Sequence, residues 1–154
     1  MDMEEIVQVA KWIALKQGYH TPMLFLDGTI AKAPVILGEF PNEHEDKIKY
    51  LYVTGKHFSK KHEIGRLNKV FFVMEAWMGT NLNIRPSRDP KRIEVLFIAC
   101  LDMLKNEQTV RSLEYVRDAN GKLNDIKDAS IPDNVIAESP LLPAFVAGYT
   151  CTGR

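Results

Sequence analysis

The sequence predicts one α+β domain, residues 1–154, built on a mostly antiparallel sheet of about five strands. Three observations support this fold class. Two helical segments flank a hairpin signal, a meander of strands follows them, and the 154-residue chain has an ordinary composition with 45% apolar and 26% charged residues. A chain of this length can bury a hydrophobic core without disulfides or metal ions.

Residues 3–17 predict the first helix. The apolar residues recur at i, i+3, i+4 and i+7, which places them on one helical face: Ile6, Val9, Ala10 and Ile13. Acidic residues at the start suit the positive end of the helix dipole. Gly18 suits a left-handed backbone just past the last turn, so we expect the helix to end there.

A hairpin is predicted next, between a strand at 21–26 and a return strand at 29–39. Asp27-Gly28 between them is a strong turn signal. Pro34 has no backbone N–H to donate, so the return strand is expected at an edge of the sheet or broken at this residue.

The second helix is predicted to begin after Pro41, with Asn42 and Glu45 forming a capping box. It should end by Gly65. Gly55 costs about 1 kcal/mol relative to alanine in a helix interior. This glycine therefore either marks close packing against the sheet or divides the helix in two.

The rest of the chain predicts a strand meander and a short terminal helix. The expected strands cover residues 69–78, 93–104 and 108–117, with a short strand near 122–127 that completes a hairpin. The first two are apolar on both faces, which is typical of central strands covered on both sides. A helix at 141–149 has apolar side chains that need a core or a second subunit to cover them.

The sequence excludes several protein classes. Its longest apolar run has seven residues, 95–101, whereas a membrane-spanning helix needs about 20, so no membrane partner is expected. The acidic start differs from a secretory signal, and Cys100 and Cys151 form no disulfide framework. We therefore expect a cytoplasmic protein with reduced thiols. The apolar neighbours of Cys100 favour burial over a nucleophilic role.

Metal and cofactor motifs are absent from the sequence. The four histidines are scattered, at His20, His44, His57 and His62. There is no His-Glu-x-x-His, no Cys-x-x-Cys and no acidic calcium loop. A Gly-x-Ser-x-Gly nucleophile motif is also lacking. We expect no metal site and no cofactor.

Charge is unevenly distributed along the chain although the formal net charge is zero. Residues 56–92 carry 9 basic and 3 acidic groups, while residues 1–55 and 93–154 each have a net charge of −3. The basic segment predicts a local surface for an anion. The alternative is that folding mixes the three segments and the fields cancel.

Two stretches of this segment supply the candidate ligand-binding residues. These are Lys60, Lys61, Arg85, Arg88, Lys91 and Arg92. Guanidinium groups make bidentate contacts with phosphate and carboxylate, so the proline-stiffened connection 85–92 is a candidate anion site. Residues 56–62 combine cations with an aromatic, a pattern that can contact nucleic acid. A solvated loop and a cationic helix end explain the same residues without a ligand.

Glu75 and Glu94 are the candidate acid–base residues. Glu75 interrupts an otherwise apolar strand, where a carboxylate must be paired or its pKa rises. Glu94 lies close to it if the two apolar strands pair. The alternative is a structural ion pair of Glu75 with one of four arginines: Arg85, Arg88, Arg92 or Arg111.

Three functional hypotheses remain open. In the first, a non-catalytic binding domain engages an anionic partner through the basic segment and forms a homodimer, because the apolar strands and tail need cover. In the second, the chain is a small metal-independent enzyme in which Glu75 or Glu94 is the acid or base and arginines hold an anionic substrate. In the third, it is a structural subunit of an oligomer. The sequence favours a binding role over catalysis.

Overall fold

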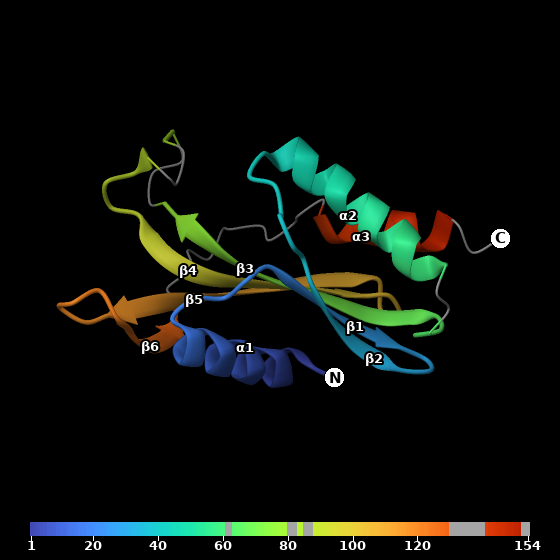
Figure 1. Cartoon of the computed structure of the whole chain (residues 1–154), viewed down its shortest axis with the longest axis horizontal. Helices are drawn as coiled ribbons and strands as arrows, with labels where there is room; N and C mark the ends of the chain where they lie inside the picture. The colour runs from blue at the N-terminus through green and yellow to red at the C-terminus, as the bar shows by residue number, and fades with distance from the viewer. Residues whose placement is uncertain (61–62, 80–82, 85–87, 130–140, 152–154) are drawn as a thin grey trace. The chain divides into compact units, whose positions relative to one another are not determined.

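The computed structural model describes residues 1–60, 63–79, 83–84, 88–129 and 141–151. Figure 1 shows the elements, which are α1 (Met3–Gln17), β1 (Met23–Gly28), β2 (Lys32–Ile36), α2 (His44–Ser59), β3 (Leu67–Met78), β4 (Ile93–Asp102), β5 (Glu107–Arg117), β6 (Leu123–Asp128) and α3 (Leu141–Cys151). The strands form one sheet in the order β2-β1-β3-β4-β5-β6. The predicted α+β class is confirmed.

The chain groups into two compact units. Unit 1 consists of Met1–Thr21, Val73–Ile98 and Val110–Val135, and unit 2 consists of Pro22–Phe72, Ala99–Thr109 and Ile136–Arg154. Strands β3, β4 and β5 contribute residues to both units. The single-domain organisation inferred from the sequence stays a prediction.

In unit 1, helix α1 has the predicted bounds and the predicted ends. The Asp2 side chain accepts the N–H of Glu5 at 2.9 Å, and Gly18 closes the helix with φ 85°. The predicted buried face is partly wrong, because Val9 is exposed and the buried residues are Ile6, Val7, Ala10 and Ala14. Short alanine side chains allow the helix backbone to lie close to the layer it covers, so the buried face is centred on them.

In unit 2, strands β1 and β2 form the expected antiparallel hairpin, and Pro34 lies opposite Phe25. Strand β2 is at the sheet edge, as predicted from the proline. The turn is displaced, however, since β1 continues through Gly28 and the connection to β2 follows it. A Cβ atom on Gly28 would collide with Ile64. Glycine therefore permits close packing at this position.

Helices α2 and α3 of unit 2 lie side by side (Figure 1) and pack against each other. Helix α2 runs unbroken through Gly55. A Cβ atom on Gly55 would overlap the carbonyl oxygen of Phe145, and one on Gly148 would overlap that of Tyr52. Gly55 thus marks close packing against α3 rather than against the sheet.

The start of α2 differs from the prediction. The helix begins at His44, and its N-cap is Glu43, which makes no side-chain capping bond. The expected capping box of Asn42 and Glu45 is therefore wrong. The acidic first turn, Glu45 and Asp46, still suits the helix dipole.

The apolar tail is covered within its own chain. Its helix α3 buries Leu141, Leu142, Phe145 and Tyr149, and the Tyr149 hydroxyl donates to the Gly65 carbonyl at 2.5 Å. These four side chains therefore need no second subunit to cover them. Consecutive residues are buried in the middle of β3 and of β4, as expected for strands covered on both faces, whereas residues 74–78 of β3 are half-buried or exposed.

Candidate functional site

The described part of the β3–β4 connection contains a turn organised by a buried aspartate. Asp89 is 2% exposed, and its Oδ1 accepts the N–H of Lys91 at 2.8 Å. Its carbonyl oxygen accepts the backbone N–H of Arg92 at 3.0 Å and one guanidinium N–H of the same residue at 3.3 Å. These bonds fix the backbone of the turn and the direction in which Arg92 leaves it.

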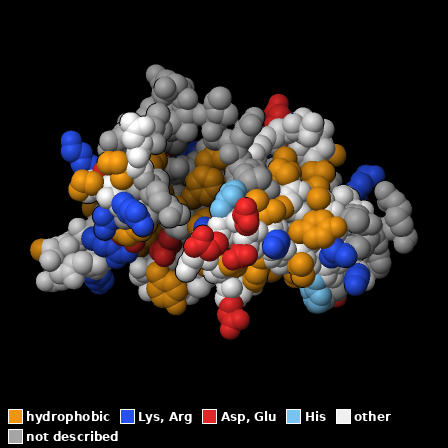
Figure 2. Space-filling view, turned by 90° about the horizontal axis from the view of Figure 1, so that it is seen from above, with side chains coloured by type: hydrophobic (Ala, Val, Ile, Leu, Met, Phe, Trp, Pro, Cys, Tyr) orange, Lys and Arg blue, Asp and Glu red, His pale blue; other side chains and the backbone are white. Residues whose placement is uncertain are grey.

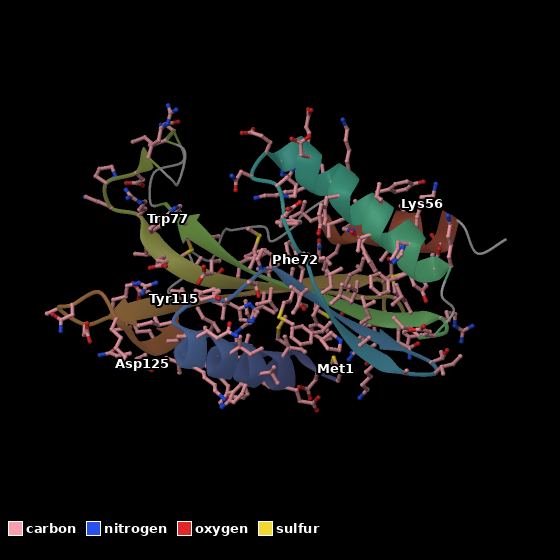
Figure 3. The ribbon with its side chains drawn as sticks, viewed as in Figure 1. Met1, Lys56, Phe72, Trp77, Tyr115 and Asp125 are labelled. Atoms are coloured by element: carbon pink, nitrogen blue, oxygen red, sulfur yellow. The ribbon has the colours of Figure 1, made fainter. Side chains whose placement is uncertain are left out.

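Arg92 stacks on an aromatic ring at the end of β3. Its guanidinium carbon lies 4.6 Å from the ring centroid of Trp77, a geometry in which the ring face attracts the cation. Trp77 is 46% exposed and is labelled in Figure 3. Arg88 and Lys91 are exposed in the same turn. The turn therefore carries three cations, one of which lies over an accessible indole.

Three of the six predicted anion-binding residues share one turn. Arg88, Lys91 and Arg92 share the turn in unit 1, whereas Lys60 follows α2 in unit 2 and is exposed. Lys61 and Arg85 lie outside the described residues. Figure 2 shows Lys and Arg side chains on the left of the view, where Figure 1 places both the β3–β4 connection and the β5–β6 hairpin of unit 1.

Glu75 has partners other than the expected arginines. Its Oε2 accepts the hydroxyl of Tyr115 at 2.8 Å and the backbone N–H of His20 at 3.0 Å. Because β4 lies between β3 and β5 in the sheet, the Tyr115 side chain spans β4 to reach the carboxylate. Burial raises the pKa of Tyr115 above its usual value, and the hydrogen bond to Glu75 raises the pKa further. Among the described residues no arginine pairs with Glu75, and Arg85, one of the four expected partners, lies outside them.

Glu94 is held by Arg117, which donates to both carboxylate oxygens at 2.7 and 2.8 Å. The guanidinium of Arg117 also lies 5.7 Å from the ring centroid of Tyr115. Arg111 pairs instead with Asp128 at 2.9 Å and with Glu4. Glu75 thus accepts a hydrogen bond from Tyr115, and Glu94 is paired with the arginine that lies over the Tyr115 ring.

Buried titratable groups elsewhere show no metal-binding arrangement within the described residues. His20 Nδ1 donates to the Thr21 carbonyl at 2.6 Å, its buried Nε2 has no hydrogen-bond partner in the described part of the chain, and burial lowers the pKa of this imidazole. Cys100 is buried as predicted, and burial raises the pKa of its thiol to about 11. A thiol with this pKa is not activated as a nucleophile at neutral pH.

A surface groove of about 650 Å³, not predicted from the sequence, runs along α2 in unit 2. Its lining comes from the exposed side of the helix and the preceding loop: Glu39, Pro41, Asp46, Lys49, Tyr50, Val53, Thr54 and His57. The Tyr50 hydroxyl donates to the Gly38 carbonyl at 2.7 Å, beside Glu39 with φ 53°. The i, i+3, i+4, i+7 spacing of Tyr50, Val53, Thr54 and His57 was the available sequence signal. Figure 2 shows hydrophobic side chains exposed over α2.

No protein-family model matches the sequence, and comparisons with curated proteins and with solved structures find no match. Among the described residues, no helix is both long and apolar enough to cross a membrane. The interpretation of the site therefore depends on its own geometry.

Proposed function

We propose that the protein is a non-catalytic binding domain that engages an anionic partner through the turn formed by residues 88–92. The observation that carries this proposal is the stacking of Arg92 on Trp77, at 4.6 Å, within a turn fixed by the buried Asp89. Arg88 and Lys91 add two exposed cations to the same turn.

The chemistry of the turn suits an oxyanion. A guanidinium lying over an indole keeps a fixed plane, and its remaining N–H groups can donate to phosphate or carboxylate in a bidentate manner. An exposed aromatic ring beside cations is also the combination that binds single-stranded nucleic acid, through base stacking and phosphate contacts. A single-stranded oligonucleotide is therefore the first probe we would choose.

We give less weight to catalysis by Glu75 or Glu94. Both oxygens of Glu94 accept bonds from Arg117, and Glu75 accepts two bonds at one oxygen. An acid–base residue needs access to its substrate. Neither carboxylate lines the groove on α2.

The binding test can use Trp77 as its own reporter. The chain contains two tryptophans, so a Trp12→Phe variant leaves Trp77 as the single indole emitter. We would titrate this variant with a mixed-sequence single-stranded oligonucleotide and, separately, with a glutamate-rich peptide, at low and moderate salt. Oligonucleotide binding is expected to quench the emission of Trp77.

Charge reversal then tests the cations. The double variant Arg88→Glu with Lys91→Glu is expected to weaken binding at least about tenfold, since a hydrogen bond to a charged group contributes about 1.5–3 kcal/mol. The slope of log affinity against log salt should become shallower by about 0.7 for each lost phosphate contact. Lys32→Glu, an exposed lysine on β2, is the matched control and should bind normally. No binding of either probe, or equal binding by the double variant, would contradict the proposal.

A further inference from the structure

The outer side of α1 exposes apolar residues. Trp12 is 62% exposed, Val9 is 42% exposed and Leu15 is 40% exposed. The buried residues Ile6, Ala10 and Ala14 lie on the opposite side of the helix. Figure 3 shows side chains of α1 projecting away from the strands of unit 1. The helix is therefore apolar on both sides, although only one side is buried in the chain.

Four residues of this outer side form a straight seam. Positions 5, 9, 12 and 16 are separated by four, three and four residues, the spacing of contact positions in paired helices. Val9 and Trp12 form the middle of the seam, Glu5 lies at its N-terminal end and Lys16 at its C-terminal end. The Lys16 ammonium lies 4.6 Å from the ring centroid of Trp12. Opposite charges thus lie at the two ends of an apolar centre.

We propose that this seam is a self-association surface on which α1 of a second copy packs in the antiparallel direction. An antiparallel pair related by a twofold axis places Glu5 of each copy beside Lys16 of the other and Val9 opposite Trp12. A parallel pair would place like charges together. The seam is therefore complementary to itself in one direction only, which identifies a second copy of this chain as the occupant.

The size of the seam sets the expected strength of the dimer. A helix of 15 residues is about 22 Å long. One such helix pair buries less than the roughly 800 Å² per partner of a standard stable interface. We expect a weak dimer whose population rises with protein concentration. The inference goes beyond the proposed function, because it needs no anionic partner and uses different residues.

Sedimentation equilibrium over a concentration series tests the dimer. The wild-type chain should change from monomer to dimer as its concentration rises from about 10 μM to about 1 mM. Trp12→Glu is expected to raise the dissociation constant at least about tenfold, as for a central aromatic contact. Val53→Glu is the matched control, because Val53 is 63% exposed on α2. This variant should dimerise like the wild type.

A charge swap tests the direction of packing. Glu5→Lys and Lys16→Glu should each weaken the dimer, because each change places like charges side by side in an antiparallel pair. The double variant E5K/K16E should recover the wild-type dissociation constant. Both single changes oppose the helix dipole, and the double variant retains both penalties, so recovery cannot arise from a more stable α1. Melting temperatures would establish that all variants are folded.

The outcomes that overturn the proposal are distinct. A wild-type chain that stays monomeric throughout the series, a Trp12→Glu variant that dimerises normally, or a double variant without recovery would each reject it. Trp12-dependent binding of a monomer to phosphatidylserine vesicles, without dimerisation, would reassign this face to a lipid surface. That result would also overturn the proposal, whereas the oligonucleotide titration would be unaffected by any of these outcomes.

Discussion

The hydrogen bond from Tyr115 to Glu75 joins a buried hydroxyl to a half-buried carboxylate at 2.8 Å. Tyr115→Phe keeps the ring but removes the donor. We expect the free energy of unfolding at pH 7 to fall by about 1.5–3 kcal/mol, the range for hydrogen bonds to charged groups. Urea unfolding measures this loss. Tyr19→Phe, at an exposed tyrosine, is the control, and an equal effect of the two changes would refute the argument.

The same tyrosine makes stability depend on alkaline pH. Burial, followed by the bond to Glu75, raises the pKa of Tyr115 in the folded state above the value of about 10 in the unfolded chain. Its contribution is therefore complete below pH 10 and decreases as the pH rises above 10, because the unfolded state then loses the proton first. The stability difference between wild type and Tyr115→Phe should shrink from pH 9 to pH 11. A constant difference across this range would contradict the assignment.

His20 provides a prediction on the acid side. Burial lowers the pKa of His20 below that of a free imidazole, so the contribution of the neutral ring is present above about pH 6.5 and is lost as the pH falls through the folded-state pKa. Nitrogen-detected NMR of the ring should show that His20 titrates below the pKa of a free imidazole, and that the neutral ring carries its proton on Nδ1, because Nδ1 faces the Thr21 carbonyl. A titration at or above the pKa of a free imidazole would be inconsistent with this prediction.

At the residue scale, the neighbouring residues in the sequence predicted whether a side chain is buried, but not which groups it bonds to. The apolar neighbours of Cys100 were sufficient to predict that it is buried. The partners of Glu75 were not predictable in the same way. Tyr115 is 40 residues away, and its hydroxyl reaches Glu75 only because of the order of strands β3, β4 and β5. The other donor is a backbone N–H, which every non-proline residue has and which carries no sequence signal.

At the element scale, the crossing of α2 and α3 depends on glycine in both helices. By helix propensity alone, Gly55→Ala and Gly148→Ala should each stabilise the protein by up to about 1 kcal/mol. We expect the opposite, a loss of about 1–3 kcal/mol for each, because the added methyl group overlaps a backbone carbonyl of the other helix. Thermal unfolding of both variants measures the effect.

A third glycine supplies the matched control for this crossing. A Cβ atom on Gly38 would meet no heavy atom within 4 Å, so Gly38→Ala should change stability by less than about 0.5 kcal/mol. If Gly55→Ala were as stable as Gly38→Ala, the helices could separate to admit a methyl group. The close crossing would then not be required for stability.

For helices and strands, the sequence predicts the features that depend on local residues but not those that depend on distant contacts. The types and order of the helices and strands follow from their periodicity, and the ends of α1 follow from Asp2 and Gly18, whose effects are local. The errors occur where a distant contact decides the outcome. Gly28 contacts Ile64, and Gly55 contacts α3. The capping-box pattern at Asn42 was present in the sequence, but α2 begins after it.

At the scale of the whole molecule, the basic block of the sequence is divided between the two units, with residues 56–72 in unit 2 and 73–92 in unit 1. Part of the cationic charge of residues 56–92 faces acidic or aromatic groups of the same unit. Arg92 stacks on Trp77, and Asp89 is buried within the basic turn. Lys60 belongs to a different unit from this turn. The sequence therefore predicted a cationic segment, and the structure places three of its basic residues in one turn, Arg88, Lys91 and Arg92.

The division into two units leads to the last prediction, which concerns cooperativity. Strands β3, β4 and β5 contribute residues to both units. Unfolding of either unit would therefore disrupt strands that the other unit also contains. We therefore expect one unfolding transition. Both tryptophans lie in unit 1 together with helix α1, whereas α2 and α3 lie in unit 2. Tryptophan fluorescence thus reports on unit 1, and helical circular dichroism reports on both units.

The two probes should give the same midpoint in urea, because both would follow the same all-or-none transition. Gly55→Ala provides the stricter test, since the change lies in unit 2 but should lower the fluorescence midpoint of the unit 1 tryptophans by the same amount as the dichroism midpoint. If Gly55→Ala left the fluorescence midpoint unchanged while the dichroism midpoint fell, the shared strands would not couple the units. The single-domain prediction would then be wrong, since each unit would be an independent folding domain.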